Sequence, residues 1–183
     1  MTSGGQPAER LVWLLRHAKA AADAPPGGGD HQRPLAPRGR RDAAALGHCI
    51  GAGGLGFGED ELPAHVVCST AARTTETAEQ VCAPLGLELD RRRRLYYGTL
   101  DDVLAELRTL DDGCRAVMVV GHNPATHALA LELLSEQAPG RDRLSSYPTC
   151  ALAVIRVGAA RWRGLAIGTG TLAGYFVPPY ATR

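Results

Sequence analysis

Short apolar runs recur along the chain with the length and composition of buried β-strands. They cover residues 11–15, 65–68 and 117–120, and valine and leucine dominate them without alternating polar positions. Such runs are typical of strands that are covered on both faces, as in a parallel sheet. The pattern therefore predicts a sheet buried between layers of helices.

Helical spacing and capping signals fall between these runs. Pro37 is placed at the first position of a helix over about 37–50. Thr99 and Asp102 form a capping-box pattern at the start of a helix over about 100–110. Both helices are long enough to cover a strand.

Two further helices are predicted directly after apolar runs. Ser69 or Thr70 is expected to cap the first of them, which places Arg73 in its first turn. Asn123 as N-cap and Pro124 as first residue are expected to begin the second, which runs to about Ser135. The helix that begins near Ser69 has an apolar face with helical spacing, at Ala78, Val81, Cys82 and Leu85.

The remaining apolar segments complete an alternation of strands and helices. A short strand is predicted near 87–90, and β-rich runs follow at about 150–157 and 162–168. This order predicts an α/β fold, a three-layer α/β/α sandwich with a mostly parallel central sheet. We expect one domain over residues 11–183, preceded by a flexible N-terminus at 1–10.

Composition narrows the class of protein. The chain has 183 residues, 45% of them hydrophobic, and a formal net charge of +1, which argues against a broad nucleic-acid surface. Residues 1–10 lack an apolar signal core, and no run is long enough to span a bilayer, so a cytoplasmic location without membrane contact is expected. The oligomeric state is left open. The cysteines are odd in number and widely spaced, which predicts reduced, mostly buried thiols: Cys49, Cys68, Cys82, Cys114 and Cys150.

Cations and imidazoles follow three of the predicted strands. Arg16 and His17 close the first run, Arg73 follows the second, and His122 follows the third. The carboxyl ends of parallel strands meet at one edge of a sheet, where open α/β folds place their chemistry. A phosphoryl group carries up to two negative charges and needs fixed cations around its oxygens. This pattern predicts phosphoryl chemistry, in which Arg16, Arg73 and His122 bind the group and His17 attacks it.

Other polar residues have simpler explanations. Ser69 lacks the G-x-S-x-G pattern of a hydrolase nucleophile. His122 and His127 lack the H-E-x-x-H spacing of a zinc site, and His31, His48 and His65 are expected at the surface or in caps. Lys19 is placed to assist substrate binding, and simple solvent exposure explains it equally well.

At these motifs the sequence resembles the histidine phosphatase superfamily, and within it the SixA-like phosphohistidine phosphatases. The first motif is Leu15-Arg16-His17, the second runs from Ser69 through Arg73 to Thr77, and the third is Val120 to Pro124. Arg33-Pro34-Leu35 with Arg38-Gly39 resembles the segment before the family's first helix. The resemblance implies a phosphatase in which His17 is the nucleophile and forms a phosphohistidine, while Arg16, Arg73 and His122 hold the phosphoryl oxygens. It implies no metal and no cofactor.

The sequence departs from the family pattern in two places. Ala18 stands where the family's first motif commonly has glycine. Many members place a carboxylic acid after the third strand or after the second histidine, where this chain has residues 95–98, Leu-Tyr-Tyr-Gly, and Asn123. Asp101 and Asp102 are alternative acids, although their place at a helix start already explains them. A missing acid favours a good leaving group such as the imidazole of phosphohistidine.

Protein phosphohistidine is therefore the first expected substrate. The alternatives are a small phosphorylated metabolite or nucleotide, and a catalytically silent phosphate-binding module. The small, Pro- and Gly-rich loop over residues 20–29 is placed to act as a lid. The simplest interpretation of the arginines at 91–94 is a run of solvent-exposed side chains. The alternative is that they steer an acidic partner.

Overall fold

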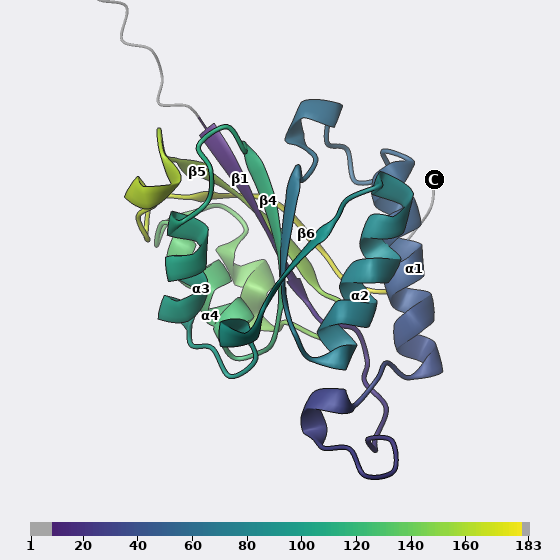
Figure 1. The fold of residues 1–183 in the computed structure, drawn as a ribbon. Coiled ribbons are helices and arrows are strands. Elements are labelled where there is room, and N and C mark those ends of the chain that lie inside the picture. The colour runs from purple at the N-terminus through teal and green to yellow at the C-terminus, as the bar shows by residue number, and fades with distance from the viewer. Residues whose placement is uncertain (1–8, 181–183) are drawn as a thin grey trace, which may run out of the picture.

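A twisted six-stranded sheet forms the centre of the part of the chain that the computed structural model describes, residues 9–180 (Figure 1). Its order is β3-β2-β4-β1-β5-β6. Strands β3, β2, β4 and β1 run parallel, and β5 pairs antiparallel with both β1 and β6. The sheet is mostly parallel, as predicted. The strands are β1 (Glu9–Arg16), β2 (His65–Ser69), β3 (Leu89–Arg92), β4 (Ala116–Gly121), β5 (Leu152–Gly158) and β6 (Thr171–Phe176).

Helices cover both faces of the sheet and complete the three predicted layers. Helices α1 (Pro37–Gly51) and α2 (Ala72–Cys82) pack on one face, and α3 (Leu100–Arg108) and α4 (Ala125–Leu133) on the other (Figure 1). Short 3-10 turns join these elements: η1 (Asp30–Gln32), η2 (Glu59–Glu61), η3 (Ala83–Leu85), η4 (Arg93–Leu95), η5 (Arg141–Ser145) and η6 (Trp162–Gly164).

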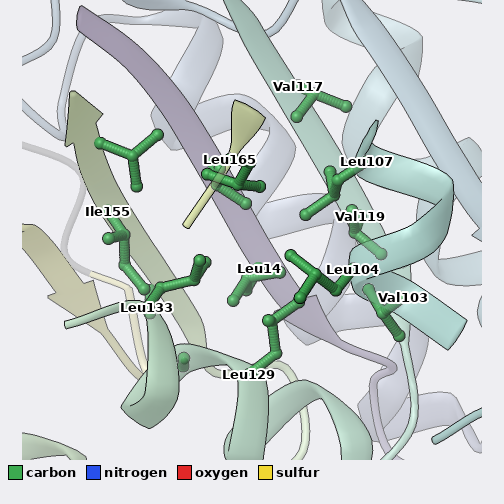
Figure 2. Packing of buried hydrophobic residues seen from close by; sticks show 14 of the residues in the cluster. Leu14, Val103, Leu104, Leu107, Val117, Val119, Leu129, Leu133, Ile155 and Leu165 are labelled. Carbon is green, nitrogen blue, oxygen red and sulfur yellow. The ribbon is translucent and has the colours of Figure 1, made fainter. Parts of the chain in front are cut away.

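The apolar run of β1 is continuous because successive side chains enter two different cores. Val12 and Leu14 pack toward α3 and α4, where Figure 2 shows Leu14 among leucines and valines of both helices and of β4. Trp13 and Leu15 pack toward α1 and α2. A strand that is buried on both faces needs no polar alternation.

Two of the predicted helix starts are confirmed. Pro37 is the first residue of α1. Thr99 caps α3: its hydroxyl accepts the amide of Asp102, and the Asp102 carboxylate accepts the amide of Thr99. The first turn of a helix leaves backbone N–H donors unpaired. Thr99 accepts one of these donors, and Pro37 has no N–H group to leave unpaired.

The predicted N-caps of the other two helices are wrong. The N-cap of α2 is Ala71, because the hydroxyls of Ser69 and Thr70 bind His122 and His31 instead. The N-cap of α4 is Pro124. The Asn123 side chain donates to the carbonyl of Tyr147, so it holds a neighbouring segment rather than capping the helix.

Some strand boundaries also differ from the predictions. Residues 162–168 form no strand: the Trp162 indole is fully buried and donates to the Cys114 carbonyl, which fixes that segment as η6, and the last strand is β6. Strand β3 begins two residues later than expected. Glu9 and Arg10 belong to β1 rather than to a flexible terminus, and residues 1–8 lie outside the described part.

Within residues 9–180, none of the helices has both the length and the apolarity needed to cross a bilayer. Four of the five cysteines are buried, as predicted, and Cys114 is partly exposed. Burial raises the pKa of the Cys68 thiol to about 11, so this thiol stays protonated near neutral pH.

Candidate active site

The sheet order brings the three motif-bearing strands together. Strand β4 lies between β2 and β1, and their registers align Cys68 with Val120 and Arg16 with Gly121. The residues that follow these strands therefore share one edge of the sheet. They surround a cavity of about 480 Å³, lined by Arg16, His17, Lys19, Ala20, Ala21, Ala22, Arg33, Arg73, Tyr96, Tyr97, His122, Asn123 and Thr149.

His17 is held in one tautomer. Its Nδ1 lies 2.8 Å from the carbonyl oxygen of Ala18, and a carbonyl can only accept, so Nδ1 carries the proton. Nε2 has no hydrogen-bond partner among residues 9–180 and keeps its lone pair. Burial, and secondarily the charges of nearby arginines, lowers the pKa of His17 to about 4. The imidazole is therefore neutral near pH 7 and available as a nucleophile.

His122 lies beside His17, with 5.2 Å between the ring centroids. Its Nε2 is 2.9 Å from the hydroxyl oxygen of Ser69, which also accepts the amide of Ala71. Burial, and after it the charges of His17 and Arg73, lowers the pKa of His122 to about 3. Both rings are thus neutral at pH 7. Ser69, expected as a helix cap, instead positions this histidine.

Three guanidinium groups give the cavity its charge. The Nε atoms of Arg16, Arg33 and Arg73 are buried and have no acceptor in the described part of the chain. Arg16 is also anchored, because its Nη1 donates to the Tyr147 carbonyl at 2.7 Å. Buried donors without acceptors are costly unless a ligand satisfies them. Planar guanidinium groups match the oxygens of a phosphoryl group.

Asp30 and Tyr96 form a support for Arg73 that the sequence analysis did not find. The Asp30 carboxylate accepts from Arg73 Nη2 at 3.0 Å and from the Tyr96 hydroxyl at 2.8 Å. It also pairs with Arg33 at 3.1 Å. The Tyr96 hydrogen bond is the largest cause that lowers the pKa of Asp30 below its usual range. The only signal in the sequence for the support of Arg73 by Asp30 is that Asp30 lies just before the segment Arg33-Pro34-Leu35.

The loop after β1 forms one wall of the cavity. Ala20 makes a bridge to Leu35, and the exposed Lys19 lines the cavity. Gly39 lets the first turn of α1 approach this loop, since a Cβ there would lie 2.2 Å from the Lys19 carbonyl oxygen. The end of the loop is tied down where Asp30 binds Arg73.

Several candidates lie away from the cavity. Asp101 and Asp102 do not line it, and the Asp102 carboxylate pairs with Arg94 and accepts the amide of Thr99, the N-cap of α3. His127 binds the Leu144 carbonyl. No aspartate or glutamate is among the lining residues. The structure thus brings together Arg16, His17, Lys19, Arg73 and His122, and adds Arg33, Tyr96 and Tyr97.

Comparison with known proteins agrees with this arrangement. The sequence model of the histidine phosphatase superfamily (branch 1) matches residues 12–96, which hold the first two motifs and the segment before α1. An uncharacterized protein of Mycobacterium tuberculosis is 39% identical over 90% of this chain and 99% of its own length.

Solved structures extend the match to more than nine-tenths of the chain. SixA from Nakamurella multipartitia is 31% identical with a TM-score of 0.77, covering 96% of this chain and 99% of its own. The protein histidine phosphatase SixA complexed with tungstate is 26% identical with a TM-score of 0.69, covering 92% of this chain and 97% of its own. The chain therefore belongs to the histidine phosphatase superfamily, in its SixA-like branch.

Proposed function

We propose that this protein hydrolyses phosphohistidine on a protein substrate, without a metal ion, through a phosphohistidine formed on His17. Membership of the histidine phosphatase superfamily and likeness to SixA support phosphatase activity. The observation that carries the proposal is the neutral His17, whose Nε2 has no hydrogen-bond partner among residues 9–180. It lies in a cavity with three guanidinium groups whose Nε atoms are buried without an acceptor, and with no lining carboxylate.

In the first step, the lone pair of His17 Nε2 forms a bond to phosphorus. The bond from phosphorus to the substrate nitrogen breaks, and its electron pair stays on the substrate ring. When the other nitrogen of that ring is protonated, the ring leaves as neutral imidazole and needs no proton from the enzyme. Arg16, Arg73 and His122 stabilise the charge on the phosphoryl oxygens. The Ala18 carbonyl stabilises the positive charge that His17 gains.

In the second step, water attacks the phosphorus bound to His17. The bond to Nε2 breaks, its electron pair returns to the ring, and phosphate leaves with the water oxygen while one proton passes to solvent. His17 is again neutral with its proton on Nδ1. The cations that held the first transition state hold the second as well, because both have the same trigonal arrangement of oxygens.

A substrate panel tests the proposed function. We expect a phosphohistidine peptide to have a higher kcat/KM than a sugar phosphate or a nucleotide. EDTA should leave the rate unchanged, because the guanidinium groups supply the positive charge. Preference for a small metabolite would overturn the substrate assignment, and loss of activity on chelation that one metal ion restores would overturn metal independence. Binding of phosphate without any turnover would favour a silent module.

Arg16→Ala and Arg73→Ala are each expected to lower kcat/KM by about 10²-fold or more, the scale of losing a preorganised donor to transition-state charge. Lysine at either position should rescue poorly, because a point charge cannot make the two-pronged contact of a guanidinium. Arg41→Ala, on the exposed side of α1, is the matched control. Near-wild-type kinetics in the Arg73→Ala variant would contradict its place at the phosphoryl group.

The pH dependence of kcat/KM is expected to reflect the lowered pKa of His17. The reaction needs neutral imidazole, so kcat/KM should not fall on account of His17 until the pH drops through about 4. An unperturbed histidine would already be half protonated at about pH 6.5. The phosphate group of the substrate also titrates, so two aryl phosphates with different second pKa values are compared. A midpoint caused by the substrate differs between the two, whereas a midpoint caused by the enzyme is the same for both. A common midpoint near pH 6.5 for both would contradict a His17 that is neutral because it is partly removed from water.

A further inference from the structure

A second hollow lies next to the candidate active site. Its volume is about 640 Å³, and it shares Tyr96 and Tyr97 with the first cavity. One ligand can therefore extend from the first cavity across the two tyrosines into the second. The other lining residues come from η1, η4 and the residue after β2: His31, Gln32, Thr70, Arg93 and Arg94.

The wall of the second hollow is cationic. Arg93 is exposed and makes no ion pair or side-chain hydrogen bond within residues 9–180. Arg94 uses its Nε for Asp102, at 2.7 Å, so its terminal nitrogens remain available to a ligand. No carboxylate lines this hollow. One guanidinium group without an acidic partner, and a second that shares only its Nε with a carboxylate outside the wall, favour an anionic ligand.

Two aromatic rings in contact give this wall an exposed edge. Tyr97 is 84% exposed, and its ring lies 4.1 Å from that of Tyr96, centroid to centroid. Tyr96 is held in turn by Asp30 and by the edge of the His31 ring. Tyrosine and arginine are among the residues most enriched where proteins bind one another. This composition favours a polypeptide over a small ion as the ligand.

We propose that this hollow binds an acidic segment of the substrate protein beside the phosphorylated histidine. The inference rests on the proposed function. While the phosphoryl group lies among Arg16, Arg33 and Arg73, a carboxylate of the same polypeptide pairs with Arg93 and Arg94. The chain has a net charge of only +1, so local placement of cations rather than overall attraction selects the partner.

Matched peptides test the inference. Two phosphohistidine peptides differ only in flanking residues, glutamate in one and glutamine in the other. We expect the wild type to prefer the acidic peptide by about 10-fold in kcat/KM through KM, with the preference falling as salt rises. Arg93→Ala combined with Arg94→Ala should remove this preference and leave turnover of an aryl phosphate unchanged, since that substrate does not reach the hollow.

Arg91→Ala is the matched control, because Arg91 belongs to the same run but pairs with Glu79 outside the hollow. It should keep the preference. The single variant Arg93→Ala avoids disturbing the Arg94–Asp102 pair and should lose part of the preference. Equal rates for both peptides would overturn the inference and leave the proposed function intact.

The remaining outcomes separate the two proposals. Hydrolysis of small phosphates but of neither peptide would overturn the proposed function, and this inference with it. The two peptides could react at equal rates while the enzyme prefers a small bisphosphate over a monophosphate, with a preference that depends on Arg93. That result would assign the hollow to a small anion and would overturn the proposal that it binds an acidic segment.

Discussion

Replacing His17 by alanine is expected to abolish turnover, lowering kcat by at least about 10³-fold, while the fold is retained. The residue follows β1 and is half-buried at the cavity, so its loss removes the proposed nucleophile without opening the apolar core. His48→Ala is the matched control, because that histidine is exposed on α1. Circular dichroism and thermal unfolding should not distinguish the two variants.

Trapping of the intermediate gives the same prediction a second readout. A substrate with a labelled phosphoryl group should transfer an acid-labile, alkali-stable label to the wild type and none to His17→Ala. Near-wild-type turnover of an aryl phosphate by His17→Ala would rule out the covalent mechanism. A label on the wild type without any turnover would favour a silent phosphate-binding module.

The second large effect is the dependence of the reaction rate on the pKa of the leaving group. A positioned general acid contributes typically 10²- to 10⁴-fold when the departing atom needs a proton. Asp30 is the carboxylate joined to the site through Arg73, and its hydrogen bond from Tyr96 lowers its pKa, so it is ionised near pH 7 and donates no proton. Burial raises the pKa of Tyr96, which makes its phenol a weak donor. Rates are therefore expected to depend steeply on leaving-group pKa.

A series of phosphate esters measures this dependence. Aryl phosphates with increasingly acidic phenols should react faster, and an unactivated alkyl phosphate should be slower than the best of them by about 10²-fold or more. Phosphohistidine should react well, because the conjugate acid of imidazole has a pKa near 6.5. A flat dependence, or a sugar phosphate as good as phosphohistidine, would show that a proton donor acts at this site.

Local patterns predicted most of the elements because each signal needs few residues. Pro37 starts α1, Thr99 and Asp102 cap α3, and the run at 11–15 is the centre of β1. The errors arose where a side chain found a distant partner. Ser69 binds His122 instead of capping α2, and the buried Trp162 donates to the Cys114 carbonyl in the segment before β4.

The amino-acid sequence alone determined the strand-end placement of Arg16, His17 and His122, because an apolar run that stops at a polar pair shows where a strand ends. It also placed Arg73 in the first turn of the helix that follows β2. Only the tertiary structure decided which strand ends are neighbours. The order β2-β4-β1 puts three motifs from distant parts of the chain around one cavity. The same packing fixed the tautomer of His17, the support of Arg73 by Asp30, and the neutral state of both histidines. Hydrogen bonds across 43 residues of chain, such as that of Arg73 to Asp30, and desolvation by surrounding segments leave no local pattern in the sequence.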